Sequence, residues 1–230
     1  PEVVRVDGTG HVTGLKKGTA TVTAYELVGG RKFQADPVTF TVTDQSTGTV
    51  TAVKVLAKDL TSNKISDGGY SVSGDSVTIK AMGQGLWATQ TANNVIVSGE
   101  NVNRGDGTFT AIVKMSGKTV NNWDEAGLFI YKDDDNYVAV ERKHGTNSPK
   151  VHVVTEANGS ANEDQNTENP NAEAIWLKLE KSGNTFTGYC SADKENWTKV
   201  GNSITNDKIG NSFGVALVAG TGNSTKGTAF

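Results

Sequence analysis

The sequence predicts an all-β chain whose larger part is an antiparallel sandwich of two sheets. Apolar and polar residues alternate with a period of two in many short segments, and no stretch shows the period of 3.6 that is typical of an amphipathic helix. Among the 230 residues are 27 glycines and only four prolines, and Gly, Asn and Asp separate the alternating segments. Regularly spaced short strands divided by such turns favour a β-sandwich.

The first alternating segments, residues 19–25 and 38–43, predict two strands near the N-terminus. Each places its apolar residues on one face: Ala20, Val22 and Ala24 in the first, and Val38, Phe40 and Val42 in the second. The polar, small residues that begin at Asp44 then interrupt the alternation, which is typical of a short linker. We therefore predict a domain over residues 1–43, a linker over 44–51 and a second domain over 52–230.

The second domain contains five further segments with the same alternation. Their apolar faces carry Val77, Ile79 and Ala81; Phe109, Ala111, Val113 and Met115; Val138 and Val140; Ile175, Leu177 and Leu179; and Phe213, Val215 and Leu217. Residues 156–173 are polar, and they predict a long loop between two of these strands.

Charge and composition exclude several classes of function. The net charge is −3 and charged residues make up 20% of the chain, so no broad basic field attracts nucleic acid or anionic lipid. The sequence contains no run of about 18 apolar residues that would predict a transmembrane helix. We expect neither nucleic-acid binding nor membrane insertion. The single cysteine, Cys190, cannot form an internal disulfide and is expected to be a buried apolar residue.

A long motif near the N-terminus carries a family resemblance. Residues 6–24 read VDGTGHVTGLKKGTATVTA, in which Asp-Gly and Gly-Leu-Lys-Lys-Gly turns reverse the chain between short strands. This motif resembles the signature of bacterial Ig-like domains, group 2. The resemblance covers residues 1–43, which lack the earlier strands of such a domain. It implies a partial Ig-like β-sandwich that serves as a spacer or adhesion module on an exported protein.

Four later segments carry a second resemblance, in their order along the chain. They are Gly-Leu-Trp at residues 85–87, Phe-Thr-Ala followed by a lysine at 109–114, residues 126–138, and residues 176–189. Together they resemble the concanavalin A-like, laminin-G-like domain that is appended to secreted bacterial glycoside hydrolases such as β-xylosidases and arabinofuranosidases. The resemblance covers residues 52–230 and implies an antiparallel jelly roll.

The sequence shows no catalytic pattern. Hydrolysis of a glycosidic bond needs two carboxylates at a defined separation, and acidic residues alone do not establish such a pair. The three histidines, His11, His144 and His152, lack metal-ligand spacing, and no Gly-x-Ser-x-Gly elbow occurs. We expect the chain itself not to be an enzyme, although its parent protein could be a glycoside hydrolase.

Three consecutive acidic residues are the candidate metal ligands. Asp133, Asp134 and Asp135 lie between two predicted strands, where a solvated hairpin tip is the simpler interpretation. Oxygen ligands on a turn can also converge on calcium, although the EF-hand spacing is absent here. Calcium is therefore the one candidate cofactor.

Two pairs of aromatic residues are candidate sugar platforms, because aromatic rings stack on the apolar faces of sugars while amides and carboxylates bind the hydroxyl groups. Trp176 falls on the polar face of residues 175–180, and a hairpin loop over 181–184 predicts Tyr189 opposite it. A turn over residues 132–136 likewise predicts Tyr131 opposite Tyr137. Packing within the sandwich is the alternative role for all four side chains.

Two tryptophans in predicted loops are further candidates. Trp87 and Trp123 lie among amide and acidic side chains: Gln84, Gln90, Asn121, Asn122 and Asp124. Such surroundings suit sugar recognition, and a structural role is equally compatible with the sequence. Trp197 follows Ser191-Ala-Asp193, a spacing that resembles the Asp-box turn of sialidases, and we expect it to anchor a hairpin.

These observations support one leading hypothesis and one alternative. The leading hypothesis is a non-catalytic carbohydrate-binding accessory region of a secreted bacterial glycoside hydrolase or cell-surface protein. Its partners would be a polysaccharide or the glycan of a glycoprotein, together with neighbouring domains of the parent protein. The alternative is a structural or adhesive spacer that packs against a catalytic domain or binds a protein without binding sugar.

Overall fold

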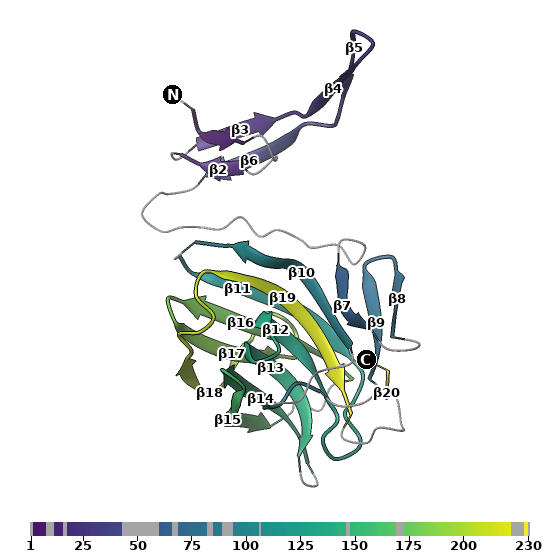
Figure 1. The fold of residues 1–230 in the computed structure, drawn as a ribbon, viewed down its shortest axis with the longest axis vertical. Helices are drawn as coiled ribbons and strands as arrows, with labels where there is room; N and C mark the ends of the chain where they lie inside the picture. Colours follow the sequence, from purple (N-terminus) through teal and green to yellow (C-terminus); the bar gives the residue numbers. More distant parts are fainter. Residues whose placement is uncertain are drawn as a thin grey trace. The chain divides into compact units, whose positions relative to one another are not determined.

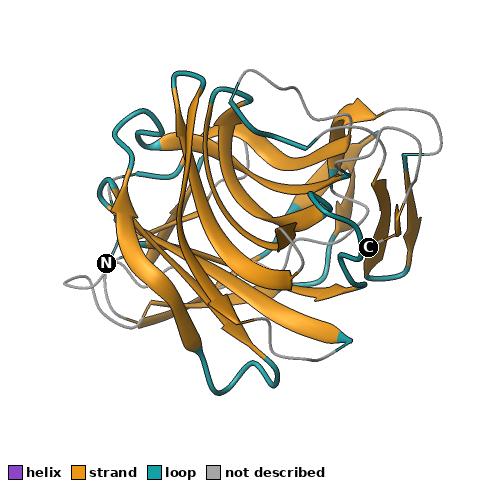
Figure 2. Ribbon diagram, turned by 90° about the horizontal axis from the view of Figure 1, so that it is seen from below, coloured by secondary structure: helices purple, strands orange, loops and turns teal. Residues whose placement is uncertain are grey.

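The fold is given by a computed structural model, which describes residues 2–7, 12–15, 18–42, 60–65, 69–81, 85–88, 94–105, 107–145, 148–168, 173–221 and 228–229 (Figure 1). Strands are the only regular elements of these residues, so the predicted all-β fold class is confirmed (Figure 2). The described part of the chain accordingly has no helix that could span a membrane. The chain divides into two compact units, Pro1–Val53 and Lys54–Phe230. The predicted linker, residues 44–51, lies outside the described residues.

The described part of the first unit consists of three antiparallel strand pairs. β1 (Val4–Val6) pairs with β2 (Val12–Gly14), β3 (Gly18–Val22) with β6 (Val38–Val42), and β4 (Tyr25–Val28) with β5 (Arg31–Gln34). The predicted apolar faces meet in the β3–β6 pair, where Ala20 faces Phe40. None of the described side chains of this unit is fully buried. The Ig-like sandwich stays a prediction.

The second unit is a sandwich of antiparallel sheets. A seven-stranded sheet has the order β15-β14-β13-β12-β19-β10-β7, a four-stranded sheet has the order β11-β16-β17-β18, and a smaller sheet has the order β20-β9-β8. The strands are β7 (Thr61–Ile65), β8 (Tyr70–Ser73), β9 (Ser76–Ala81), β10 (Asn94–Asn103), β11 (Phe109–Ser116), β12 (Glu125–Asp133), β13 (Asn136–Gly145), β14 (Ser148–Ala157), β15 (Ser160–Glu168), β16 (Ala174–Ser182), β17 (Thr185–Ser191), β18 (Thr198–Thr205), β19 (Ser212–Gly220) and β20 (Thr228–Ala229).

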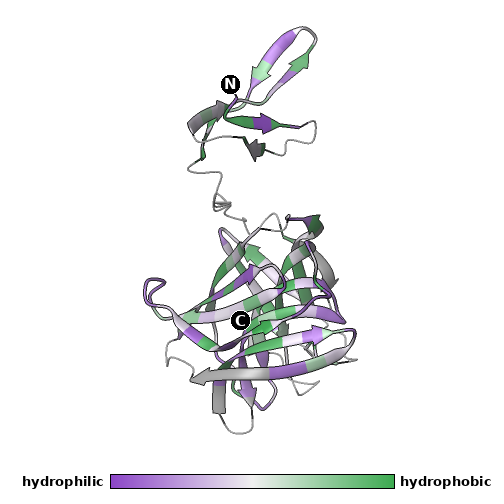
Figure 3. Cartoon of the chain, turned by 90° about the vertical axis from the view of Figure 1, so that its left-hand side faces the viewer, coloured by the Kyte–Doolittle hydropathy of each residue, from purple (hydrophilic) through white to green (hydrophobic). Residues whose placement is uncertain are grey.

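The main core lies between the two large sheets. All the apolar residues that the alternation of the second domain predicted belong to this core or pack against it. Along β16 the alternation is strict, with Ile175, Leu177 and Leu179 buried in the core and their neighbours partly exposed. The sheets approach closely at Gly188, where an added Cβ would overlap the side chain of Val153. Figure 3 shows apolar stretches along the strands of this unit.

The seven-stranded sheet also buries its other face, which we call its outer face. A second apolar cluster lies there, formed by Leu86, Val95, Val97, Phe129, Tyr131, Tyr137, Ala139, Val154, Ala216 and Val218, with Trp87 packed against it. Nearly every residue of β12 is therefore buried, those of both faces alike. The alternation of the sequence does not predict this second buried face.

The polar segment of residues 156–173 differs from its prediction. Instead of a long loop, β14 continues to Ala157 and a turn at Asn158 and Gly159, both with positive φ, leads into β15. β15 pairs only with β14 and forms an edge of the seven-stranded sheet. Over residues 156–168 the loop prediction was wrong, because an edge strand can be polar throughout and still form its backbone hydrogen bonds. Residues 169–172 of the predicted loop lie outside the described residues.

Candidate functional site

A short loop, residues 85–88, covers the outer face of the seven-stranded sheet and positions Trp87. The Tyr137 hydroxyl group donates a hydrogen bond of 2.7 Å to the carbonyl oxygen of Leu86. The backbone N–H of Ala88 donates to Glu156 Oε2 at 2.9 Å, and Ala88 has a φ of 54°, in the left-handed region that side chains disfavour. These contacts fix the backbone on both sides of Trp87.

A tight turn positions Trp123 in a comparable way. Asp124 Oδ2 accepts hydrogen bonds from the backbone N–H groups of Val120, at 3.1 Å, and Asn121, at 2.9 Å. The backbone N–H of Trp123 donates to the carbonyl oxygen of His144 at 2.6 Å. Trp123 has a φ of 71° and a side chain that is 53% exposed. Because strained backbone of this kind concentrates at functional sites, the turn marks Trp123 as a candidate ligand contact.

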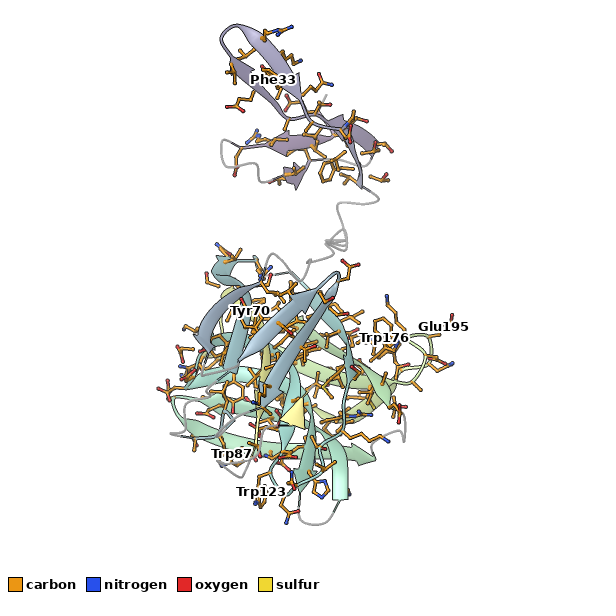
Figure 4. All side chains as sticks on the ribbon, turned by 90° about the vertical axis from the view of Figure 1, so that its right-hand side faces the viewer. Phe33, Tyr70, Trp87, Trp123, Trp176 and Glu195 are labelled. Atoms are coloured by element: carbon orange, nitrogen blue, oxygen red, sulfur yellow. The ribbon has the colours of Figure 1, made fainter. Side chains whose placement is uncertain are left out.

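The two tryptophans meet at Lys143. Its ammonium nitrogen lies 4.4 Å from the centre of the Trp87 ring and 6.0 Å from that of Trp123, which are cation–π distances. Lys143 is buried at the end of β13. Figure 4 shows Trp87 and Trp123 beside each other on the sandwich. The structure thus brings together both loop tryptophans that the sequence indicated.

A charged cluster lies on the same face of the sheet. Glu125 on β12 faces Lys143, and Glu141 on β13 faces His152 on β14. Glu163 on β15 lies 2.6 Å from Lys143 Nζ through one carboxylate oxygen and 2.6 Å from His152 Nδ1 through the other. We call the combined group the tryptophan–carboxylate cluster; its members are Trp87, Trp123, Glu125, Glu141, Lys143, His152 and Glu163.

The pKa values of the carboxyl groups in this cluster are shifted in opposite directions. Burial raises the pKa of Glu125 to about 7, against the lowering effect of Lys143. Burial together with the nearby Glu125 raises the pKa of Glu141 well above its ordinary value. Hydrogen bonds from His152 and Lys143 instead lower the pKa of Glu163 to about 2. The cluster therefore combines an ionised carboxylate with carboxyl groups that can hold a proton near neutral pH, and it offers both donors and acceptors.

Several polar atoms at this site have unused hydrogen-bonding capacity. Among the described residues, Glu125 Oε1, Glu156 Oε1 and His152 Nε2 are buried without a hydrogen-bond partner. Glycines lie against two of the carboxyl side chains, since an added Cβ at Gly85 would overlap Glu125 and one at Gly127 would overlap Glu141. Buried polar atoms are usually paired, so such a concentration on one face is typical of a site that binds polar groups.

The predicted tyrosine pair lies beneath this site. Tyr131 does face Tyr137 across β12 and β13, as the hairpin predicted. However, the two side chains are only 2% and 0% exposed, so they do not form a sugar platform, and packing, the alternative role, applies to both. The covering loop explains the difference. Tyr137 supports that loop through Leu86, and the Tyr131 hydroxyl donates to Asp134 Oδ1 at 2.6 Å.

The second predicted pair lies on the four-stranded sheet. Trp176 and Tyr189 share its outer face, but Trp176 faces Ser191 and Tyr189 faces Lys178. The direct opposition that we predicted was wrong because the hairpin turns over Gly183 and Asn184 alone, which shifts the register by two residues. An even shift keeps both rings on one face.

The candidate calcium ligands take part in the β12–β13 turn. Asp133 Oδ1 accepts hydrogen bonds from Asp135 N, at 3.0 Å, and from Asn136 Nδ2, at 2.7 Å. Asp134 accepts the hydrogen bond from Tyr131. Within the part of the chain that the structure describes, no three His, Cys, Asp or Glu side chains are grouped so that they could hold a metal ion.

Sequence reasoning missed the charged members of the cluster. Glu125, Glu141 and Glu163 come from three strands, and only the order of those strands in the sheet brings them together. One signal was present in the sequence: Gly127 interrupts the apolar residues of 126–131, which indicates close approach of another chain segment.

Comparison with known families gives one match. Residues 67–228, more than half of the chain, match the family described as "Protein of unknown function (DUF1349)". None of the curated proteins matches the chain.

Solved structures share the fold of the second unit. The GH43 protein BlXynB from Bacillus licheniformis is 17% identical with a TM-score of 0.65, over 77% of this chain and 36% of that protein. A functionally unknown protein from Saccharomyces cerevisiae is 17% identical with a TM-score of 0.62, over 76% of this chain and 92% of that one. A xylan beta-1,4-xylosidase from Bacillus halodurans C-125 is 17% identical with a TM-score of 0.58, over 71% and 33% of the two chains. The chain thus spans about a third of the length of both Bacillus proteins. At such identity the likeness establishes the fold alone, and it confirms the predicted β-sandwich jelly roll.

Proposed function

The chain belongs to the family described as "Protein of unknown function (DUF1349)", and we propose that its sandwich binds carbohydrate at the tryptophan–carboxylate cluster. The observation that carries this proposal is the convergence of the Trp87 and Trp123 rings on Lys143, directly beside buried carboxyl groups. Aromatic faces with adjacent charged and polar groups are the combination that sugars need, because a sugar ring has apolar C–H faces and a polar rim.

The exposure and the charge of each side chain in the cluster indicate its role in ligand binding. Trp123 is the most exposed member and provides the stacking surface, while Trp87 forms its second wall. The Glu163 side chain is 27% exposed, so its carboxylate can accept hydrogen bonds from ligand hydroxyl groups at the rim. The Glu163 carboxylate, 2.6 Å from Lys143 Nζ, also holds the ammonium group in contact with both rings, and the carboxyl groups of Glu125 and Glu141 lie deeper.

The local backbone prepares the site before a ligand binds. Trp87 and Trp123 both lie in short segments that hydrogen bonds anchor to neighbouring strands. Rings that are already ordered lose little conformational entropy on binding, which improves affinity.

We further propose that the chain serves as a non-catalytic accessory region of an exported bacterial protein that acts on or adheres to polysaccharide. Two of the proteins with the same fold are a GH43 protein and a xylosidase, each about three times the length that this chain matches. The resemblance of residues 6–24 to the signature of bacterial Ig-like domains supports an extracellular setting. In that role, binding would raise the local concentration of the parent protein on its polysaccharide.

The decisive experiment measures binding of the chain and of its Trp123→Ala variant to a glycan array and to insoluble neutral plant polysaccharides. Because Trp123 is largely exposed, the variant is expected to fold normally. Its affinity for the glycan is expected to be at least about tenfold lower than that of the wild type. Tyr25→Ala is the matched control, since Tyr25 is a 60% exposed aromatic residue in the other unit. No binding to any glycan, or equal binding by wild type and Trp123→Ala, would refute the proposal and favour a structural spacer.

A further inference from the structure

The outer face of the four-stranded sheet carries a second set of aromatic residues. Along β16 the side chains of Trp176, Lys178 and Glu180 point away from the core and are partly exposed. Tyr189 lies on the adjacent strand β17 and is the diagonal neighbour of Trp176. Diagonal neighbours on adjacent strands lie about 7 Å apart. We call this surface the Trp176 face; its members are Trp176, Tyr189, Trp197, Lys114, Lys178 and Lys194.

Lysines lie over every aromatic ring of the Trp176 face. Lys114 Nζ is 5.7 Å and Lys194 Nζ is 4.8 Å from the centre of the Trp176 ring. Lys178 Nζ is 4.1 Å from the Tyr189 ring and 4.8 Å from the Trp197 ring. The face is therefore a layer of rings with ammonium groups held above it.

A structured turn holds Lys194 in this position. Asp193 Oδ1 accepts hydrogen bonds from the backbone N–H of Asn196, at 2.7 Å, and of Glu195, at 2.8 Å, and these bonds lower the pKa of Asp193 below its usual range. The Ser191 hydroxyl accepts from Lys194 N at 3.0 Å, and Lys194 has a φ of 70°. The Asp-box-like sequence thus forms a strained turn that positions Lys194 over the Trp176 ring.

The carboxylates of this face already bind other groups of the protein, whereas two of its lysines have no carboxylate partner among the described residues. Glu180 pairs with Lys178 at 2.9 Å and also accepts a hydrogen bond from the Tyr189 hydroxyl, and Asp193 is used within its turn. Lys114 and Lys194 have no carboxylate partner among the described residues. Unpaired positive charge therefore flanks Trp176, and Figure 4 shows Trp176 next to the Glu195 loop and away from Trp87 and Trp123.

We propose that the Trp176 face is a second binding surface, and that its ligand is a linear polysaccharide bearing carboxylate groups. A neutral sugar could stack on Trp176 only by displacing a lysine from the ring. The carboxylate of a uronic acid residue can instead bind Lys114 and Lys194 where they already lie, while its sugar ring contacts the edge of Trp176. At the tryptophan–carboxylate cluster the one lysine, Lys143, already pairs with Glu163 at 2.6 Å and is not available to a carboxylate of the ligand. The two faces therefore select different polysaccharides, and this inference does not depend on the first proposal.

The test measures binding of polygalacturonate and of the same polymer in its methyl-esterified, uncharged form. We expect the acid form to bind at least tenfold more tightly than the ester, and its binding to weaken as salt rises. Trp176→Ala and the double variant Lys114→Gln/Lys194→Gln are each expected to lower its affinity about tenfold. Lys80→Gln, on the exposed side of β9, is the charge-matched control and should bind like wild type.

Three outcomes would overturn the proposal. Equal binding of acid and ester would show that the lysines do not select the ligand. Equal binding of poly-L-glutamate would show a general anion surface rather than a sugar site. Loss of polygalacturonate binding in Trp123→Ala, with full binding in Trp176→Ala, would place the ligand at the other face. Because Trp123→Ala should leave this binding unchanged, failure of either proposal can be distinguished from failure of the other.

Discussion

The two outer faces of the sandwich carry similar residues in different environments. Both combine two or more aromatic rings with at least one lysine at cation–π distance. On the seven-stranded sheet the 85–88 loop lies against Glu125 and Lys143, most of the charged groups are buried, and three of the carboxyl groups there have strongly shifted pKa values. On the four-stranded sheet the side chains stay partly exposed and the lysines lie on the surface. The covering loop, and not the residue types, separates the two faces.

This difference decides what each charge contributes. A buried lysine that pairs with a carboxylate beside further buried carboxyl groups is coupled to the stability of the whole sheet, because charges without partners are costly to bury. A lysine of a surface pair contributes little to stability, since water and salt screen it, and it remains available to a ligand. We therefore expect substitutions on the two faces to separate effects on stability from effects on binding.

The largest expected effect is that of Lys143→Ala. The substitution leaves Glu125, Glu141 and Glu163 buried or half-buried around a missing cation, and we expect the free energy of unfolding to fall by about 3–5 kcal/mol. Lys178→Ala removes a partly exposed lysine paired with Glu180 and is expected to lower it by less than about 1 kcal/mol. Denaturant unfolding followed by tryptophan fluorescence measures both, because all four tryptophans lie in the sandwich unit. Equal losses in the two variants would show that burial does not distinguish the faces.

The same contrast explains how far the sequence predicts the fold. β16 was predicted residue by residue, because one face packs on the core and the other meets water, so that alternation in sequence becomes alternation in burial. The apolar face of β13 was also predicted, but its opposite face is buried as well. The loop that buries it comes from residues 85–88, more than 40 positions earlier, and a local pattern contains no information about such a cover.

The candidate site was predictable only in part for a related reason. Trp87 and Trp123 stood out because loop tryptophans among amides are unusual. Glu125, Glu141 and Glu163 gave no such signal, since each is an ordinary acidic residue until the strand order brings them together. The position of Tyr189 depended on the length of one hairpin turn, and Gly183, with a φ of 55°, permits the shorter turn.

A pH dependence of stability should come from the covered face. Burial raises the pKa of Glu125 from the ordinary 4.5 to about 7, so between these pH values the folded protein binds more protons than the unfolded chain. The free energy of unfolding should therefore fall as the pH rises from about 4.5 to about 7. Glu125→Gln removes this titration, and we expect the fall to shrink by on the order of 2–3 kcal/mol.

Thermal unfolding across pH 2 to 8 measures this slope, and the exposed Glu195→Gln serves as control. Glu163 contributes in the opposite direction: its pKa is lowered to about 2, so the stability that it provides is present above pH 4.5 and is lost as the pH falls toward 2. Glu125→Gln should leave this acid limb in place. An unchanged slope between pH 4.5 and 7 in the variant would mean that Glu125 is not buried as a carboxyl group on this face.

A smaller effect on stability than that of Lys143→Ala is expected for Gly127→Ala, which tests the packing of the covered face without changing a charge. An added Cβ at Gly127 would meet the backbone of β13 at Val140 and Glu141, so the two strands must separate or Glu141 must move. Overpacking of this kind is expected to lower the free energy of unfolding by about 2 kcal/mol. Gly107→Ala is the matched control, because no atom lies within 4 Å of its added Cβ.

If Gly127→Ala also weakens glycan binding while the Trp176 face keeps its own affinity, the glycine acts through the position of Glu141 and the cluster above it. A tolerated Gly127→Ala would instead show that the covered face can open as easily as the exposed one, and the contrast between the two faces would then rest on Lys143 alone.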